Sequence, residues 1–400
     1  MTHTSGMQRW CAWSALLLVV SLTTIVRADS WPPPTPQSYL SIDKTWRFTV
    51  TPRALSGQLA YFEDKVAHRK PAGAIPGNLQ KQAQGFMEHL EQGQWRAVWN
   101  APLVNDVGPV SAIVSPSGRV VTFDNWASMG WGNDAVVLYT SQGRPLRVMG
   151  LKDFLPAEYI EALPSSVSSL WWGGGHYFSA DGRQLVLRVA IPFIHGPGRS
   201  AIADEDAPHL EMRFDLATGR LFPVEEKAWS SAMAAAREVN AATHKAEMVA
   251  QAHFIAPLTG PHSDLDQDWH GYLIEAFFRL DPDWKDDFPA TKVLRLPQRP
   301  DYQASVGFLR DALHDELSQD GALMIASPSQ DNLVRVLTEL GPGVRRGWLK
   351  HARVYVVVDA AHKAAVAKAL ALSGAKFIPL DPNRPIPQRK ERLDAYMARK

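Results

Sequence analysis

The chain has 400 residues and a formal net charge of +1 at neutral pH, and its single cysteine, Cys11, excludes an intrachain disulfide. This length is too great for one ordinary domain and suits two. The near-neutral charge, without a basic run, gives no reason to expect nucleic acid or an anionic membrane surface as a partner.

The N-terminus has the pattern of an export signal over residues 1–28. Arg9 supplies a positive charge, residues 12–25 are apolar and uncharged, and residues 26–28 (VRA) form a small-x-small cleavage site. The apolar run is shorter than the 20 or so residues that cross a bilayer. We therefore expect cleavage before Asp29, a mature protein without a thiol that is periplasmic or secreted, and no stable membrane insertion afterwards.

The first part of the mature chain predicts a β-rich domain. Residues 29–38 contain the proline-rich sequence WPPPTPQ and form an extended lead-in. The β-rich domain is expected over residues 39–224. Alternating apolar and polar residues predict its first strands, and helical spacing predicts one helix. The expected strands are 46–50, 59–63 and 95–99, and the helix is 79–90.

Repeated turns that end in Gly-Arg follow over residues 110–222. Each one lies between two short apolar runs, so each predicts a hairpin whose glycine has a positive φ. A short helix is expected between Pro156 and Pro164. The four turns end at Arg119, Arg144, Arg183 and Arg220.

Two of these turns resemble a known signature. Residues 115–119 (SPSGR) followed by VVTF, and residues 179–183 (SADGR) followed by LVL, are similar to the blade turns of TolB-like β-propellers. The two matches start 64 residues apart, whereas known blades repeat every ~40–50 residues. The resemblance implies a β-rich binding scaffold, either a sandwich or propeller-like, without a particular activity. The segment VVTFDNW also resembles uncharacterised exported proteins.

The second half of the chain changes to helical patterns. Residues 225–253 are rich in alanine and lack glycine and proline, which predicts a helical connector. Residues 254–400 alternate strands with helices, which predicts a small α/β domain with a largely parallel sheet. The fold class expected is α+β with two domains. Helices are expected at 264–280, 303–318, 328–340, 360–372 and the C-terminus, and strands at 292–296, 322–326, 354–358 and 376–380.

One candidate site is the polar loop over residues 123–134. Loops on a rigid sheet often carry binding residues. Trp126 and Trp131 could stack on a sugar or peptide, and Asp124 and Asp134 could pair for glycoside chemistry. Alternatively, the tryptophans cover the core of their own hairpin, and the polar residues make turn hydrogen bonds. The sequence favours this structural interpretation.

A second candidate is the segment Trp171-Trp172 followed by three glycines and His176. The glycines would let a ligand approach the backbone, and a histidine can act as an acid or base near neutral pH. The glycines do not open a helix after a strand, so the segment does not predict a nucleotide site. A histidine at such a turn is more often a surface or core group than a catalyst.

A third candidate lies at the start of the expected helix 264–280. Asp264, Asp266, Asp268 and Glu275 have the spacing of calcium ligands in an EF-hand loop. Trp269, however, occupies the position where the sharp turn needs glycine. A helix start with acidic residues in its first turn explains the pattern better. His262 and His270 could join these carboxylates around a transition metal, but a solvated polar face explains them better. We therefore expect no cofactor, with calcium as the alternative.

These patterns lead to one preferred function and two alternatives. We expect an exported envelope protein that binds or scaffolds a glycan, peptide or protein through the tryptophan-bearing loops. The alternatives are a cofactor-free hydrolase using Asp124, Asp134 or His176, and a metal-binding module over residues 262–275.

Overall fold

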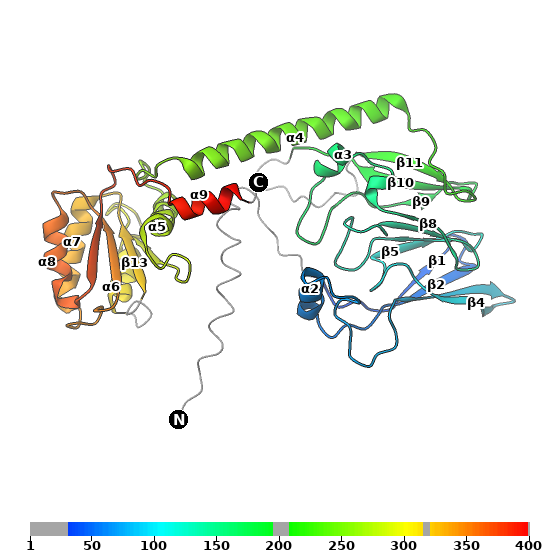
Figure 1. Ribbon diagram of the computed structural model, residues 1–400, viewed down its shortest axis with the longest axis horizontal. Helices are drawn as coiled ribbons and strands as arrows, with labels where there is room; N and C mark the ends of the chain where they lie inside the picture. Colours follow the sequence, from blue (N-terminus) through cyan, green and yellow to red (C-terminus); the bar gives the residue numbers. More distant parts are fainter. Residues whose placement is uncertain (1–30, 195–207, 315–320, 399–400) are drawn as a thin grey trace. The chain divides into compact units, whose positions relative to one another are not determined.

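The computed structural model describes residues 31–194, 208–314 and 321–398. The chain divides into two compact units, one ending at Ala246 and the other beginning at Glu247 (Figure 1). The predicted export signal, residues 1–28, lies outside the described residues. Within the part that is described, no helix is long and apolar enough to cross a membrane. The fold is α+β, as expected, with antiparallel sheets in the first unit and a parallel sheet in the second.

The first unit contains three antiparallel sheets, and in each one the strands follow the order of the chain. The first sheet has β1 (Gln37–Leu40), β2 (Trp46–Thr51), β3 (Gln84–Glu91) and β4 (Gln94–Pro102). The second has β5 (Ser111–Val114), β6 (Val120–Phe123), β7 (Val136–Tyr139) and β8 (Pro145–Met149). The third has β9 (Tyr177–Phe178), β10 (Gln184–Ala190) and β11 (His209–Asp215).

The second sheet is the middle layer of a stack of three (Figure 1). On one side Ala112, Val114 and Val137 pack with Phe48 and Met87 of the first sheet. On the other side, Val121 and Leu138 belong to one cluster with Leu185 and Phe214 of the third sheet. Every residue of β6 (VVTF) and β7 (VVLY) is buried. A strand covered on both faces needs such a continuous apolar run, which explains these two sequences.

The Gly-Arg turns are hairpin turns, as predicted. Gly118 and Gly182, two of the four turn glycines, have φ values of 73° and 68°. Ser115 and Ser179 stabilise the same two turns, because each side-chain oxygen accepts a hydrogen bond from a backbone N–H across the turn.

Two predictions in the first unit are wrong. Residues 59–63 lie in helix α2 (Gln58–Val66) rather than a strand, and they bury only Tyr61. The expected helix over 79–90 is instead a loop followed by β3, where Gly85 and Met87 are buried at alternate positions. In both segments the apolar run is short enough to fit either period, and tertiary packing decides between them.

Helix α4 (Glu226–Ile255) confirms the predicted helical connector, and the division between the two units falls within it. Its first half packs on α3 (Ala157–Glu161), where Trp229 stacks on Tyr159 with 6.1 Å between ring centroids. Buried Ala232, Met233 and Ala236 continue this contact.

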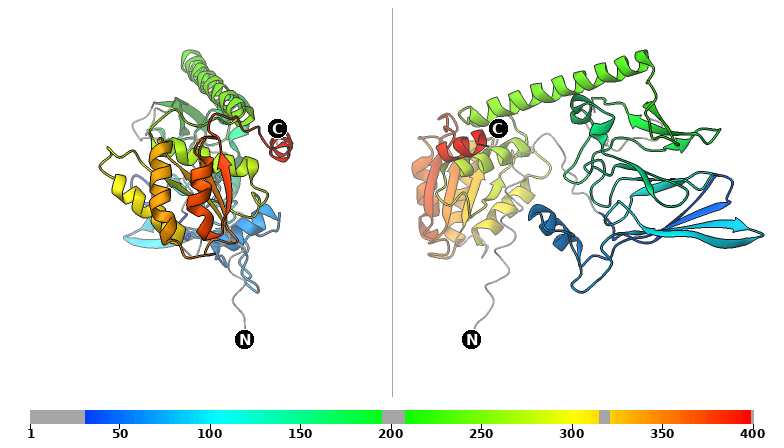
Figure 2. Two further views of the ribbon diagram at one scale, coloured as in Figure 1. Left: turned by 90° about the vertical axis from the view of Figure 1, so that its left-hand side faces the viewer. Right: turned by 45° about the vertical axis from the view of Figure 1, so that its right-hand side comes forward.

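The second unit has a parallel sheet, as predicted, in the order β12 (Ala290–Val293), β13 (Ala322–Ala326), β14 (Arg353–Val357) and β15 (Lys376–Leu380). Helix α5 (Asp266–Leu280) packs on one face, where its aromatic residues join Met324 and Tyr355. The opposite face carries α6 (Tyr302–His314), α7 (Gln330–Leu340) and α8 (Lys363–Leu370) (Figure 2). Each of these helices connects two adjacent parallel strands. Because such crossovers are right-handed and the strands follow one another in order, all three helices lie on the same face of the sheet. Helix α9 (Lys390–Met397) ends the described chain.

Candidate functional site

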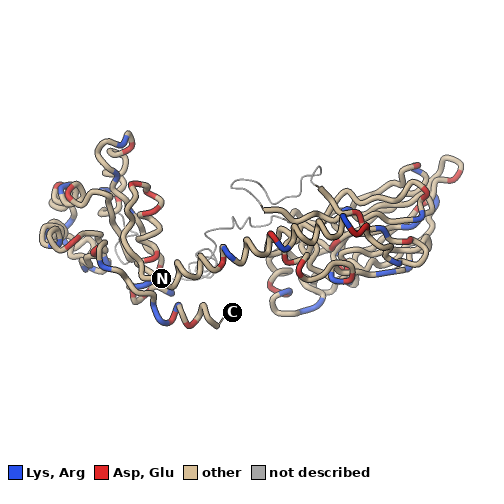
Figure 3. Tube along the Cα trace, turned by 90° about the horizontal axis from the view of Figure 1, so that it is seen from above, with Lys and Arg blue, Asp and Glu red and all other residues tan. Residues whose placement is uncertain are grey.

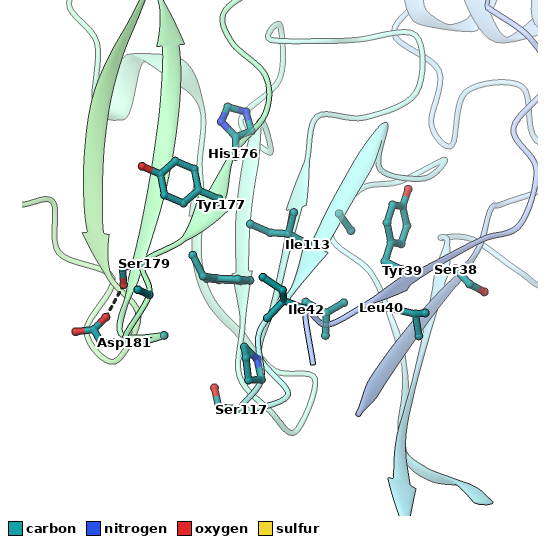
Figure 4. Close-up of a pocket in the computed structure, with 16 residues that line it drawn as sticks. Ser38, Tyr39, Leu40, Ile42, Ile113, Ser117, His176, Tyr177, Ser179 and Asp181 are labelled. Atoms are coloured by element: carbon teal, nitrogen blue, oxygen red, sulfur yellow. Dashed lines mark hydrogen bonds between the residues drawn. The ribbon is translucent and has the colours of Figure 1, made fainter. Parts of the chain in front are cut away.

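A groove opens in the first unit where one edge of each of its three sheets meets the others (Figure 4). Its volume is about 830 Å³, within the range of roughly 300–1,000 Å³ that is usual for ligand pockets. The lining comes from β1, β5 and β9 and from the turns that follow them. Among the described residues, no strand pairs with the outer edges of these three strands.

The outer edge of β5 directs backbone hydrogen-bonding groups into the groove. The Ser115 N–H donates to the Arg119 carbonyl at 2.9 Å, and this bond closes the β5–β6 hairpin. Hydrogen-bonded pairs alternate in an antiparallel ladder, so Ile113 pairs with β6 and its two neighbours do not. The N–H and C=O groups of Ala112 and Val114 therefore point away from β6, and both residues line the groove.

The same alternation holds for the other two strands. In β1, the Ser41 N–H donates to the Trp46 carbonyl, which leaves the backbone groups of Ser38 and Leu40 on the outer edge. In β9, the Ser179 N–H donates to the Gln184 carbonyl, which leaves Phe178 on the outer edge. All three of these outer-edge residues line the groove.

The side chains around the groove are mainly apolar and several are exposed. Leu40 is 51% exposed, Ile42 is 89% exposed and Tyr177 is 40% exposed. The Tyr177 hydroxyl donates to Glu211 at 2.7 Å, which fixes the ring beside the groove. Figure 4 shows Ile42 and Ile113 in the middle of the groove. His176 lies at one end of the groove, and the turns that carry Ser117 and Asp181 lie at the other.

The groove differs in charge from the rest of the surface. Lysine, arginine and acidic residues are interspersed along both units (Figure 3). Of the described residues that line the groove, by contrast, Asp181 is the one with a carboxyl group and His176 the one with an imidazole. Asp181 is already hydrogen-bonded, because Ser179 Oγ donates to it at 2.6 Å and the Arg183 N–H donates at 3.0 Å. These bonds lower the pKa of Asp181, the Ser179 bond most.

Beneath the end of the groove at His176 lies a buried cluster built around Asp124, which is only 6% exposed. Its carboxylate accepts hydrogen bonds from the Gly130 N–H at 2.7 Å and from Trp172 Nε1 at 3.0 Å. Asp124 itself has a φ of 58°, in the left-handed region. Burial outweighs both hydrogen bonds and raises the pKa of Asp124 to about 7.

His176 joins this cluster to the groove. Its ring stacks on Trp172 with 4.8 Å between centroids and contacts Phe123 with 4.3 Å. Its Nδ1 accepts a hydrogen bond from the Arg188 N–H at 3.1 Å, so the tautomer is Nε2–H. Burial, assisted by the charges of His209 and Arg188, lowers the pKa of His176 to about 3. The imidazole is therefore neutral at physiological pH and serves as part of the packing.

The structure brings together Asp124, Trp172 and His176, and it buries two of the four tryptophans of the expected binding surface. Trp172 is 1% exposed, and Trp126 is buried against Tyr61 with 5.2 Å between ring centroids. Of the four tryptophans only Trp131, which is half-exposed, and the partly exposed Trp171 reach the surface.

Asp134 is mainly a structural residue of the same loop. Burial raises the pKa of its partly buried carboxyl group. Its backbone carbonyl and that of Asp124 both accept hydrogen bonds from Asn105 Nδ2, at 3.0 and 2.7 Å. Asn105 therefore holds the two ends of the 124–134 loop together, consistent with turn hydrogen bonding.

Three of the four residues considered for calcium lie at the start of α5, as the helix interpretation predicts, and Glu275 lies further along the helix. Asp264 precedes the helix, and Asp268 lies in its first turn. Asp266 is paired with Arg295, and Glu275 accepts hydrogen bonds from Arg279 and Arg392 at 2.8 and 2.9 Å. Within the described ranges, no group of three or more His, Cys, Asp or Glu side chains is placed to hold a metal ion.

The groove itself was not predicted from the sequence, and of the predicted site residues only His176 lines it. The residues of the groove come from three strands that are distant along the chain, β1 with Leu40, β5 with Ile113 and β9 with Tyr177, and from the turn after β1 with Ile42. One local signal was present, because Ile42 is an apolar residue in the otherwise polar turn SIDK and is almost fully exposed.

No protein-family model matches the chain, and neither does any curated protein.

Proposed function

We propose that this protein acts outside the cytoplasm and binds a polypeptide ligand in the groove of its first unit. The observation that carries the proposal is the meeting of three unpaired sheet edges around one groove of about 830 Å³. Exposed strand edges are recognised by other polypeptide chains. The location rests on the export signal predicted for residues 1–28.

The groove suits a polypeptide better than a glycan. Sugar binding by stacking would need exposed aromatic faces beside free polar groups. Here none of the four candidate tryptophans lines the groove, the Tyr177 hydroxyl is already bonded to Glu211, and Asp181 is already hydrogen-bonded. Apolar side chains, aliphatic and aromatic, make up most of the lining instead. The resemblance to propeller blades, which also implies a binding scaffold, stays part of this proposal.

Binding is also favoured over hydrolysis. Both carboxylate oxygens of Asp124 face Trp172, and the Asp124 side chain is buried. The His176 ring is packed between Trp172 and Phe123, and its pKa is too low for general base catalysis near neutral pH.

The test is a peptide array probed with the mature protein and with a Leu40→Glu/Ile42→Glu variant. Both side chains are exposed, so the fold should survive, and the introduced charges should remove binding of the positive peptides. Val98→Glu is the matched control, because Val98 is an exposed apolar residue of β4 in the same sheet and does not line the groove.

A glycan array and a set of ester substrates are tested in parallel. Peptide binding that the groove variant loses and Val98→Glu keeps would support the proposal. Binding of glycans alone, ester hydrolysis, or peptide binding that the groove variant leaves unchanged would overturn it.

A further inference from the structure

We infer that the ligand joins the middle sheet as a fifth strand beside β5, and that it is an uncharged segment of a partner polypeptide with apolar or β-branched residues on both faces. This inference rests on the proposed function and specifies its binding mode and ligand chemistry.

The backbone of β5 is the first reason. Ala112 and Val114 present two N–H donors and two C=O acceptors in a row along the outer edge of β5. An extended peptide backbone has donors and acceptors with the same repeat, since every second residue of a strand faces the same neighbour. Pairing there would continue the existing ladder in which Ile113 pairs with Val121 of β6.

The neighbours on each side of β5 are the second reason. Ala112 and Val114 face the first sheet, whereas Ile113 packs on the cluster shared with the third sheet. A strand added beside β5 would alternate in the same way. Its side chains would face the exposed Leu40 and Ile42 on one side and Tyr177 and Phe178 on the other.

The middle sheet itself shows which residues suit such a position. Its strands β6 and β7 are covered on both faces, and their sequences are VVTF and VVLY. Both are free of charge and rich in β-branched residues. A fifth strand in the same layer would be under the same requirement, so its sequence should be of this kind.

Charge complementarity gives the same result. Among the described residues that line the groove, the neutral His176 and the already hydrogen-bonded Asp181 are the only titratable groups besides two tyrosines. A charged ligand side chain would lose water in the groove without gaining an ionic partner there. The lining therefore selects an uncharged segment.

The probe for testing this inference is a fluorescent peptide with the core Val-Val-Thr-Phe between two Ser-Gly pairs, measured by fluorescence anisotropy with the full mature protein. Two derivatives carry N-methyl groups, one on the first and third core residues and the other on the second and fourth. Only one of these sets can face β5 in a paired strand.

We expect one N-methylated derivative to bind at least tenfold more weakly than the parent peptide and the other to bind within about threefold of it. A derivative with aspartate in place of the second core valine should also lose at least tenfold. Equal affinities for the two N-methylated derivatives, whether both high or both low, would overturn strand addition.

The outcomes separate this inference from the proposed function. Suppose that array peptides bind and that the Leu40→Glu/Ile42→Glu variant no longer binds them. If the affinity then does not depend on the N-methyl pattern, or is higher for charged sequences, only the strand-addition inference fails. If neither the array peptides nor the probe bind, the proposed function fails as well.

Discussion

The two units each contain a sheet that is covered on both faces, but they cover it differently. In the second unit, helices pack on both faces of the parallel sheet, and all five residues of β13 are buried. In the first unit, the cover of the middle sheet consists of two further sheets. Similar apolar strand sequences therefore serve two architectures.

The difference matters at the sheet edges. A helix satisfies its own backbone hydrogen bonds, whereas every open sheet brings two edges with unpaired groups. Stacking three sheets places β1, β5 and β9 at one groove. The comparison teaches that covering a sheet with other sheets leaves strand edges beside a groove, and this is where we propose that the ligand binds.

A buried aspartate in each unit extends the comparison. Asp281, at the end of α5, is fully buried and is hydrogen-bonded by Arg353 at 2.7 Å and by the Tyr355 hydroxyl at 2.8 Å. Asp124 in the first unit receives hydrogen bonds from Gly130 and Trp172, neither of which is charged. One unit thus compensates its buried carboxylate with a cation and the other with neutral donors.

The largest expected effect comes from Trp172→Ala. Trp172 is almost fully buried in the main core of the first unit and donates to Asp124. Removing it should lower the free energy of unfolding of that unit by about 3–5 kcal/mol. Hydrogen exchange measured by mass spectrometry should show the loss in residues 31–246 only. A loss below about 1 kcal/mol would mean that Trp172 is not a core residue.

The second largest loss of stability is expected for Arg353→Met in the other unit. The substitution leaves Asp281 buried without its cation, and we expect a loss of about 3 kcal/mol. Lys390→Met is the control, because Lys390 forms an exposed ion pair with Asp394 at 2.6 Å in the same unit. That variant should lose much less stability than Arg353→Met, because exposed ion pairs contribute little. Equal losses for the two variants would contradict the role assigned to the buried pair.

The third prediction concerns pH. The raised pKa of Asp124 means that the folded state binds an extra proton between about pH 4 and pH 7, so its contribution to stability falls as pH rises. The lowered pKa of His176 has the opposite effect, because the unfolded state binds the extra proton between about pH 3 and pH 6.5. The two contributions nearly cancel between about pH 4 and pH 6.

Single variants should reveal each contribution. Relative to the parent protein, Asp124→Asn should add a slope of about +1.4 kcal/mol per pH unit to the free energy of unfolding between pH 4.5 and 6. His176→Gln should add a slope of similar size and opposite sign. Urea titrations at several pH values measure both. Parallel pH profiles for all three proteins would refute the assignment of shifted pKa values.

The smallest expected effect on stability is that of Ile42→Ser, which changes an almost fully exposed side chain. The free energy of unfolding should stay within about 0.5 kcal/mol of the parent value, while affinity for groove peptides falls. Calorimetry and anisotropy measure the two quantities. A large loss of stability would show that Ile42 belongs to the core rather than to a binding surface.

The sequence predicted those features that depend on local pattern. The Gly-Arg turns, the helix ending at Ile255 and the alternating strands and helices of the second unit all follow from turn chemistry and periodicity. Residues 59–63 and 79–90 were mispredicted because short apolar runs fit two periods. The buried positions of Trp126 and Trp172 depend on partners far along the chain.

The groove could not be predicted from the sequence for the same reason. Leu40, Ala112 and Phe178 meet there because three sheets stack, and nothing local to any one of them indicates the other two. Among the groove residues, only Ile42 departs from its local sequence pattern, as an apolar residue in a polar turn. The candidate binding residues could therefore be found only once the sheet order was known.

The most direct test is amide hydrogen exchange by NMR with and without saturating Val-Val-Thr-Phe probe. The Ala112 and Val114 N–H groups point to the groove, whereas the Ile113 N–H points to β6. The account predicts that bound peptide slows exchange at Ala112 and Val114 at least tenfold and leaves Ile113 unchanged. Exchange at Ala112 and Val114 that stays the same in the presence of bound peptide would contradict it.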